Sequence, residues 1–116
     1  MLKILSVALV LLVASVIEAD ATTGGRILSF GTNACEDFVA APEQGQQMYL
    51  SWAVGFISGA NMFDESDARL TGSKFTPDSY LLWLKNYCTQ KPLAVFVEAA
   101  SKLREELAVN EGLRSR

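Results

Sequence analysis

The chain has 116 residues and a formal net charge of −3; half of its residues are hydrophobic and none is histidine. This length allows one domain. The mild negative charge and the scattered basic residues provide no stripe for phosphate contacts, so we expect no nucleic-acid partner. The lack of histidine excludes Ser-His-Asp and Cys-His catalysis and every zinc site that needs a histidine ligand.

Residues 1–21 have the pattern of a cleaved secretory signal peptide. A positive Lys3 precedes an almost unbroken apolar run over residues 4–17, and Ala19 and Ala21 supply the small residues that signal peptidase requires. The apolar run is shorter than the roughly 20 residues of a membrane span. An uncleaved N-terminal anchor is the alternative. We therefore expect export to the periplasm and no membrane attachment after cleavage.

The exported part begins with a predicted flexible leader over residues 22–32, which are small, polar and glycine-containing. A short first helix is predicted over residues 34–40, with Thr32 or Asn33 as its N-terminal cap. Two acidic residues in its first turn suit the positive end of the helix dipole. The Ala-Pro-Glu-Gln-Gly segment that follows should end this helix.

A longer helix is predicted over residues 46–63, where apolar residues recur at steps of three and four. On another face, Ser51, Gly55 and Gly59 are spaced by four residues. A glycine inside a helix costs roughly 1 kcal/mol relative to alanine, so a compensating interaction is expected. We expect close helix packing inside the domain at this face; the alternative is a seam between two copies of the chain.

A polar loop is predicted over residues 64–75. Its Asp64-Glu65-Ser66-Asp67 segment superficially suggests a cation site, but it lacks the alternating oxygen ligands, central glycine and final glutamate of an EF-hand loop. We interpret the segment as a solvated acidic turn and expect no metal.

Two further helices are predicted, over residues 77–88 and 92–109. Thr76 as cap and Pro77 at the first helical position mark the start of the former. The latter carries apolar residues at helical spacing, and residues 110–116 should fray. The predicted fold class is therefore all-α: a small bundle of three to four helices over residues 33–109.

The two cysteines, Cys35 and Cys88, would join the first and third of these helices. In an exported chain they should be oxidised to a disulfide, whereas two free buried thiols are the alternative. No nucleotide-binding glycine motif is present, and adjacent acids such as Glu105 and Glu106 diverge on a helix. We expect no enzymatic activity and no cofactor.

Two short motifs resemble the HdeA/HdeB family of periplasmic acid-stress chaperones. They are Cys35-Glu36-Asp37-Phe38 and Cys88-x-x-x-Pro92, and the likeness extends over residues 33–107. The resemblance implies a small helical protein with one disulfide, folded as a homodimer near neutral pH. In strong acid, such a protein dissociates, loosens and holds unfolding clients on its exposed apolar surface.

On this hypothesis the function is that of an acid-activated holdase, and any switch should lie below about pH 5, because only carboxylates can titrate. The alternatives are an immunity-type module that recognises one periplasmic protein at neutral pH, and a pocket for a small apolar ligand. Exposure of Trp83 at neutral pH would favour the immunity-type module, whereas burial of Trp83 in a dimer or in the core would favour the acid-activated holdase. The aromatic and aliphatic residues predicted to contact clients or a partner are Trp52, Phe56, Ile57, Tyr80, Trp83 and Phe96, with Trp83 as that discriminating side chain.

Overall fold

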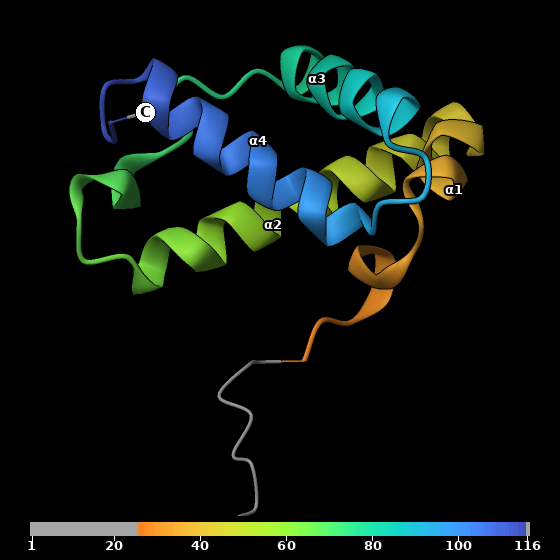
Figure 1. The fold of residues 1–116 in the computed structure, drawn as a ribbon, viewed down its shortest axis with the longest axis horizontal. Helices are drawn as coiled ribbons and strands as arrows, with labels where there is room; N and C mark the ends of the chain where they lie inside the picture. The colour runs from red at the N-terminus through yellow and green to blue at the C-terminus, as the bar shows by residue number, and fades with distance from the viewer. Residues whose placement is uncertain (1–25, 116) are drawn as a thin grey trace, which may run out of the picture.

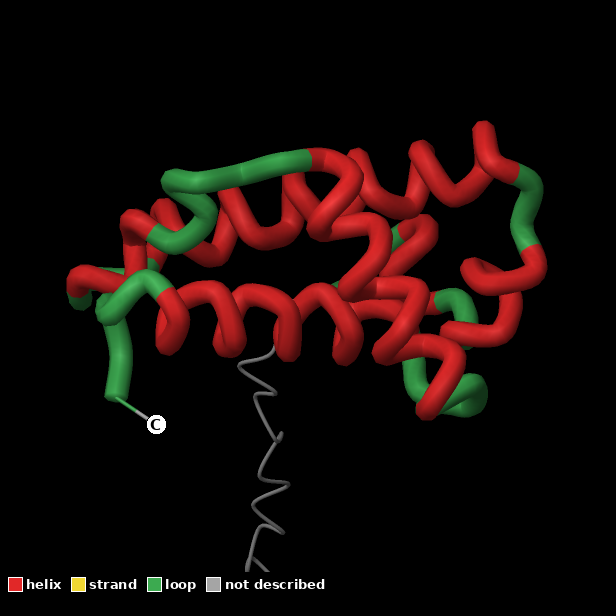
Figure 2. The backbone as a smooth tube through the Cα atoms, turned by 90° about the horizontal axis from the view of Figure 1, so that it is seen from above, coloured by secondary structure: helices red, strands yellow, loops and turns green. Residues whose placement is uncertain are grey.

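The computed structural model describes residues 26–115, so the predicted signal peptide lies outside the described residues. The described chain is all-α, as predicted, and it has no strand apart from one isolated bridge between Ala34 and Val95 (Figure 2). Its elements are the helices α1 (Cys35–Ala40), α2 (Glu43–Phe63), α3 (Pro77–Gln90) and α4 (Phe96–Asn110), and the 3₁₀ helices η1 (Ser29–Thr32) and η2 (Asp67–Leu70).

The helices pack around one apolar core, in which α4 lies between α2 and α3 and α1 closes one end (Figure 1). The Cys35–Cys88 disulfide joins α1 to α3, which confirms the predicted pairing. The largest side chains with almost no exposed surface come from α1, α3 and α4; apart from the cysteines they are Phe38, Leu84, Phe96 and Leu103.

The first turn of α1 is capped by backbone groups and not by a side chain. The Cys35 N–H donates to the Ala94 carbonyl at 2.8 Å, and the Glu36 N–H donates to the Pro92 carbonyl at 2.9 Å. These bonds satisfy donors that a helix leaves unpaired at its N-terminus. The predicted cap within residues 32–33 is therefore wrong, because the segment before α4 occupies that place.

The first residues of α2 and α4 differ from the prediction by three and four residues. Helix α2 begins at Glu43, three residues earlier than predicted. Pro42 precedes the helix at a position where no backbone N–H is needed, and the Pro42 carbonyl accepts the first helical hydrogen bond, from the Gln46 N–H. Helix α4 begins only at Phe96, because the preceding residues 92–95 make the backbone bonds to the start of α1.

The segment before α1 differs from the expected leader over residues 22–32. Its last four residues form η1, and the Phe30 ring packs on Tyr49 with 4.7 Å between ring centroids. Gly31 is buried in the same turn. The folded domain therefore begins before the first predicted helix.

The C-terminal residues also differ from the frayed tail predicted over residues 110–116. The Leu113 N–H donates to the Ala108 carbonyl at 2.8 Å, which closes the end of α4 after the left-handed Gly112. The Arg114 guanidinium reaches back to the carboxylate of Asp64 at 3.0 Å. The chain is therefore tied to the bundle through residue 114.

Gly31 and Gly55 offer a matched pair of substitutions that tests this packing. A Cβ at residue 31 would overlap the Trp52 ring, whereas a Cβ at residue 55 would meet nothing within 4 Å. Gly31→Ala should therefore lower the free energy of unfolding by about 1–3 kcal/mol. Gly55→Ala should raise it by about 0.5–1 kcal/mol, because alanine is the better helix former. Urea denaturation followed by circular dichroism measures both; equal effects would contradict the placement of Trp52 over η1.

Candidate functional site

The six residues predicted to contact a client or partner occupy two environments. Three are buried in the core, and three are half-buried at its edge. Those in the core are Ile57, Tyr80 and Phe96, and those at the edge are Trp52, Phe56 and Trp83. The structure therefore does not present all six on the surface. Trp83 is half-buried, so it is neither the exposed side chain that would favour the immunity-type module nor the buried one that would favour the acid switch.

Trp52 and Phe56 form one wall of an apolar groove on α2. Their rings stack with 5.4 Å between centroids and an angle of 12° between planes. The groove has a volume of about 420 Å³ and is completed by residues 26–28, Ser51 and Gly55. Trp83 stands elsewhere, on α3, where it stacks on Tyr87.

The close packing expected at Ser51, Gly55 and Gly59 is absent within the described chain. A Cβ at either glycine would meet nothing within 4 Å, and Ser51 and Gly55 are exposed. The prediction is wrong because the core contacts of α2 come from its other face, which includes Tyr49 and Ala53. The alternative of a seam between two copies stays open.

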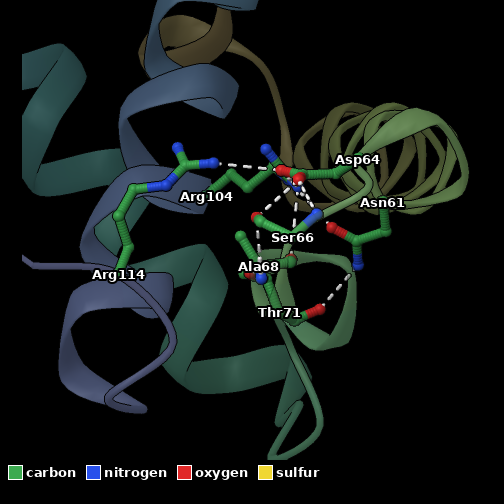
Figure 3. A network of polar contacts seen from close by, with 7 residues as sticks. All are labelled: Asn61, Asp64, Ser66, Ala68, Thr71, Arg104 and Arg114. Carbon is green, nitrogen blue, oxygen red and sulfur yellow. Dashed lines mark hydrogen bonds and ion pairs between the residues drawn. The ribbon is translucent and has the colours of Figure 1, made fainter.

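Asp64, at the end of α2, accepts hydrogen bonds from three residues (Figure 3). Its Oδ2 accepts from Nη2 of Arg104 at 2.9 Å and from Nη2 of Arg114 at 3.0 Å. Its Oδ1 accepts from the Ser66 N–H at 2.9 Å and from the Ser66 hydroxyl at 2.6 Å. The side chains of Asp64 and Arg104 are only 15% and 14% exposed, so water screens this ion pair less than a surface pair.

Arg104 extends this network to the loop that carries η2. Its Nε donates to Oδ1 of Asn61 at 2.8 Å, and its Nη2 donates to the Ala68 carbonyl at 3.2 Å. Nδ2 of Asn61 in turn donates to the Thr71 carbonyl at 2.7 Å. We call the seven residues drawn in Figure 3 the Asp64 cluster: Asn61, Asp64, Ser66, Ala68, Thr71, Arg104 and Arg114.

The hydrogen bonds of the Asp64 cluster favour the ionised carboxylate. Those from Ser66 and Arg104, in that order, hold the pKa of Asp64 well below its ordinary value. The interpretation of residues 64–67 as a solvated acidic turn is therefore wrong for Asp64. A local signal was present, because Asp-x-Ser is a turn in which the aspartate bonds to the residue two positions on. Its arginine partners lie 40 and 50 residues away, beyond the reach of any local pattern.

Burial is the largest cause of a raised pKa at two tyrosines of α3, and a nearby glutamate adds to it at each. Burial, followed by the nearby Glu111 carboxylate, raises the pKa of Tyr80. Burial and the hydrogen bond to Glu98, which accepts from the Tyr87 hydroxyl at 2.7 Å, raise the pKa of Tyr87 to about 12. Both hydroxyls therefore stay protonated at neutral pH, so each is able to donate a hydrogen bond.

The Tyr80 side chain also borders a second cavity, of about 170 Å³, between α2, the loop after η2 and α3. Tyr80 is 5% exposed, and its hydroxyl has no hydrogen-bond partner among the described residues. The sequence predicted Tyr80 as a contact residue but gave no sign of this unpaired hydroxyl.

The described residues contain no group of three or more cysteine, aspartate or glutamate side chains that could hold a metal ion. Within residues 26–115, no helix combines the length and the apolar character needed to cross a membrane. The candidate functional features are thus the apolar groove, the Asp64 cluster and the Tyr80 cavity. Comparison of the chain with protein-family models, curated proteins and solved structures gives no match.

Proposed function

We propose that this protein is an exported, acid-activated holdase that hides its apolar core at neutral pH and exposes it to unfolding proteins in acid. The observation that supports the proposal best is the Asp64 carboxylate, which two arginines from the C-terminal part of the chain share. A holdase of this kind needs such an interaction, which is present near neutral pH and is lost on protonation.

The sign of the pH dependence follows from the lowered pKa of Asp64. A carboxyl whose pKa is lower in the folded state stabilises that state fully above its ordinary value of 3.8. This contribution falls as the pH drops through that value toward the folded-state pKa. With no histidine in the chain, no side chain of ordinary pKa adds a switch near pH 6.

Protonation of Asp64 would free the loop that carries η2. Without the carboxylate, Arg104 and Arg114 would face each other with no shared counter-ion. The freed segment includes the buried residues Ala68 and Thr71, and its movement would open the wall that covers Ile57. The expected result is new apolar surface at the α2–α3 side of the bundle.

The Cys35–Cys88 disulfide would keep the loosened chain compact. It joins α1 and α3, and the loop between residues 64 and 76 lies within the segment that it closes. A disulfide of this kind persists in oxidising compartments, which fits an exported protein. Because the linkage restricts the loosened state, refolding on neutralisation should be rapid.

The test is an acid titration of residues 22–116 with the disulfide intact, from about pH 7 to about pH 2. Tryptophan fluorescence, binding of a hydrophobic dye and molecular size should report loosening below about pH 4, with reversal on neutralisation. A client-aggregation assay at the same pH then measures holdase activity. A domain that stays folded and binds no dye at the lowest pH would contradict the proposal.

Asp64→Asn isolates the contribution of the carboxylate. This variant should be less stable than the native protein at neutral pH, with a melting temperature lower by several degrees. The difference should shrink as the pH falls below 3.8, because Asp64 of the unfolded native chain then takes up a proton that the folded chain binds only at lower pH, and this favours unfolding. Thermal unfolding across this pH range makes the measurement.

Asp67→Asn is the matched control, since Asp67 is exposed and makes no ion pair with any residue of the described range 26–115. It should leave the melting temperature nearly unchanged at every pH. If Asp64→Asn and Asp67→Asn behave alike, the Asp64 cluster is not the acid-sensitive element.

The apolar groove beside Trp52 and Phe56 favours a second function, recognition of one protein partner at neutral pH. This groove is open in the folded chain, and aromatic side chains of this kind often dominate protein interfaces. Trp52→Ala would then abolish partner binding at neutral pH, whereas Asp64→Asn, which leaves the groove intact, would keep it. A pull-down at neutral pH with native and Trp52→Ala proteins separates this function from the holdase.

A further inference from the structure

The cavity beside Tyr80 combines an apolar wall with one unused hydrogen-bond donor. Val54, Ile57 and Phe75 supply the apolar side, and the Phe75 and Tyr80 rings meet edge to face at 4.7 Å. The Tyr80 hydroxyl lies beside Gly72, where a Cβ would come within 3.3 Å of the oxygen. A buried donor without a partner is rare in folded proteins and calls for an explanation.

The other polar groups of this cavity are already used as donors. The Ser58 hydroxyl donates to the Val54 carbonyl at 2.8 Å, and the Thr71 hydroxyl donates to the Ala68 carbonyl at 2.6 Å. Each of these hydroxyl oxygens can still accept a hydrogen bond. Among the three hydroxyls of the cavity, only that of Tyr80 is a free donor, and those of Ser58 and Thr71 remain as acceptors.

Charge and size limit what could occupy the cavity. The Gly72 N–H, at its edge, donates to the Glu111 carboxylate at 3.1 Å, which places a negative charge nearby. This charge disfavours an anion in the cavity, and it also helps to keep the Tyr80 hydroxyl protonated. The volume of about 170 Å³ resembles that of engineered apolar cavities of roughly 150 Å³ that bind benzene.

We propose that the Tyr80 cavity binds a small neutral aromatic alcohol of the phenol class. The ring of such a molecule would lie against Val54, Ile57 and Phe75. Its hydroxyl would accept a hydrogen bond from Tyr80 and donate one to the hydroxyl of Ser58 or Thr71. A hydroxyl is the group that satisfies both requirements, since a carbonyl only accepts and a carboxylate would meet Glu111.

The site is separate from the apolar groove and does not depend on the proposed holdase function. Two residues of its lining belong to the Asp64 cluster: Asn61, on α2, and Thr71, in the loop after η2. Binding should therefore be measured near neutral pH, where the cluster is ionised and the wall is in place.

The test uses phenol as the probe, with toluene and benzoate as matched compounds that lack the hydroxyl or carry a charge. Titration of the ¹⁵N- and methyl-labelled protein by NMR should show saturable shifts at Val54, Ile57 and Tyr80 with phenol in the millimolar range. Toluene should bind more weakly, and benzoate should not bind.

Tyr80→Phe tests the assigned donor. The variant should fold, because it removes a buried unpaired hydroxyl and keeps the ring. Its affinity for phenol should fall about three- to tenfold, while its affinity for toluene is unchanged or higher. Tyr87→Phe, on the same helix, removes a hydroxyl that bonds to Glu98 outside the cavity and should bind phenol like the native protein.

Two outcomes would overturn the proposal. If phenol causes no saturable shift at millimolar concentration, the cavity holds solvent alone. If the native protein and Tyr80→Phe bind phenol equally, the hydroxyl is not the recognition group and the site does not select aromatic alcohols.

Discussion

Phe96→Ala should lower the free energy of unfolding by about 3–5 kcal/mol, the largest effect that we expect from one core side chain. Phe96 has no exposed surface, and it begins α4 at the point where the bundle is most aromatic. Its ring centroid lies 5.0 Å from that of Phe38, 4.8 Å from that of Tyr49 and 6.0 Å from that of Trp52. Alanine would remove all three contacts and leave a cavity that the covalently linked helices cannot easily close.

A loss of this size is large compared with the total stability of a small domain, which is about 5–15 kcal/mol. Urea denaturation at neutral pH, followed by far-ultraviolet circular dichroism, measures it. Leu93→Ala is the matched control, because Leu93 lies three residues earlier and is 83% exposed. It should change the stability by less than about 0.5 kcal/mol. A small effect of Phe96→Ala would mean that the aromatic core is packed differently.

Removal of the disulfide by the double substitution Cys35→Ala and Cys88→Ala should lower the free energy of unfolding by about 4 kcal/mol. The two cysteines are 53 residues apart, so the bond closes more than half of the described chain into a loop. In the chain-entropy account, the bond mainly restricts the unfolded state. Alanine is preferred to serine here, because both sites are fully buried and a hydroxyl would need a partner.

Chemical denaturation with and without a thiol reductant separates this contribution from packing. The reductant should destabilise the native protein by a similar amount and should leave the double alanine variant unchanged. If the native protein is equally stable with and without reductant, the disulfide does not stabilise the domain. The acid titration of the double variant then shows whether the linkage is needed for refolding on neutralisation.

The helices and the disulfide could be predicted because they depend on local or covalent chemistry. The apolar spacing in α2, α3 and α4 marks amphipathic helices, and Pro77 marks the start of α3. The cysteine pair had one intramolecular combination. The errors lie at helix ends: Thr32 and Asn33 suit a cap by residue type, but the backbone near Pro92 caps α1 instead.

The functional features were less predictable, because each one joins distant segments. Asp64 forms its ion pairs with Arg104 and Arg114 only when α2 and α4 pack side by side. Nor could spacing alone tell which face of α2 turns inward: Ser51, Gly55 and Gly59 could have lain against a neighbouring helix, yet they face outward.

The sequence by itself therefore determined an all-α domain with a disulfide between its first and third helices, because apolar periodicity and the number of cysteines do not depend on how the helices pack. The tertiary structure alone decided that Asp64 is an ionised, shared carboxylate and that the buried Tyr80 hydroxyl has no hydrogen-bond partner in the part of the chain that the structure describes. Both outcomes depend on the loop between α2 and α3 folding back over the bundle. A loop can adopt many positions, and the position of this one is fixed by contacts with Arg104 and Arg114, which lie 40 and 50 residues after Asp64 in the sequence.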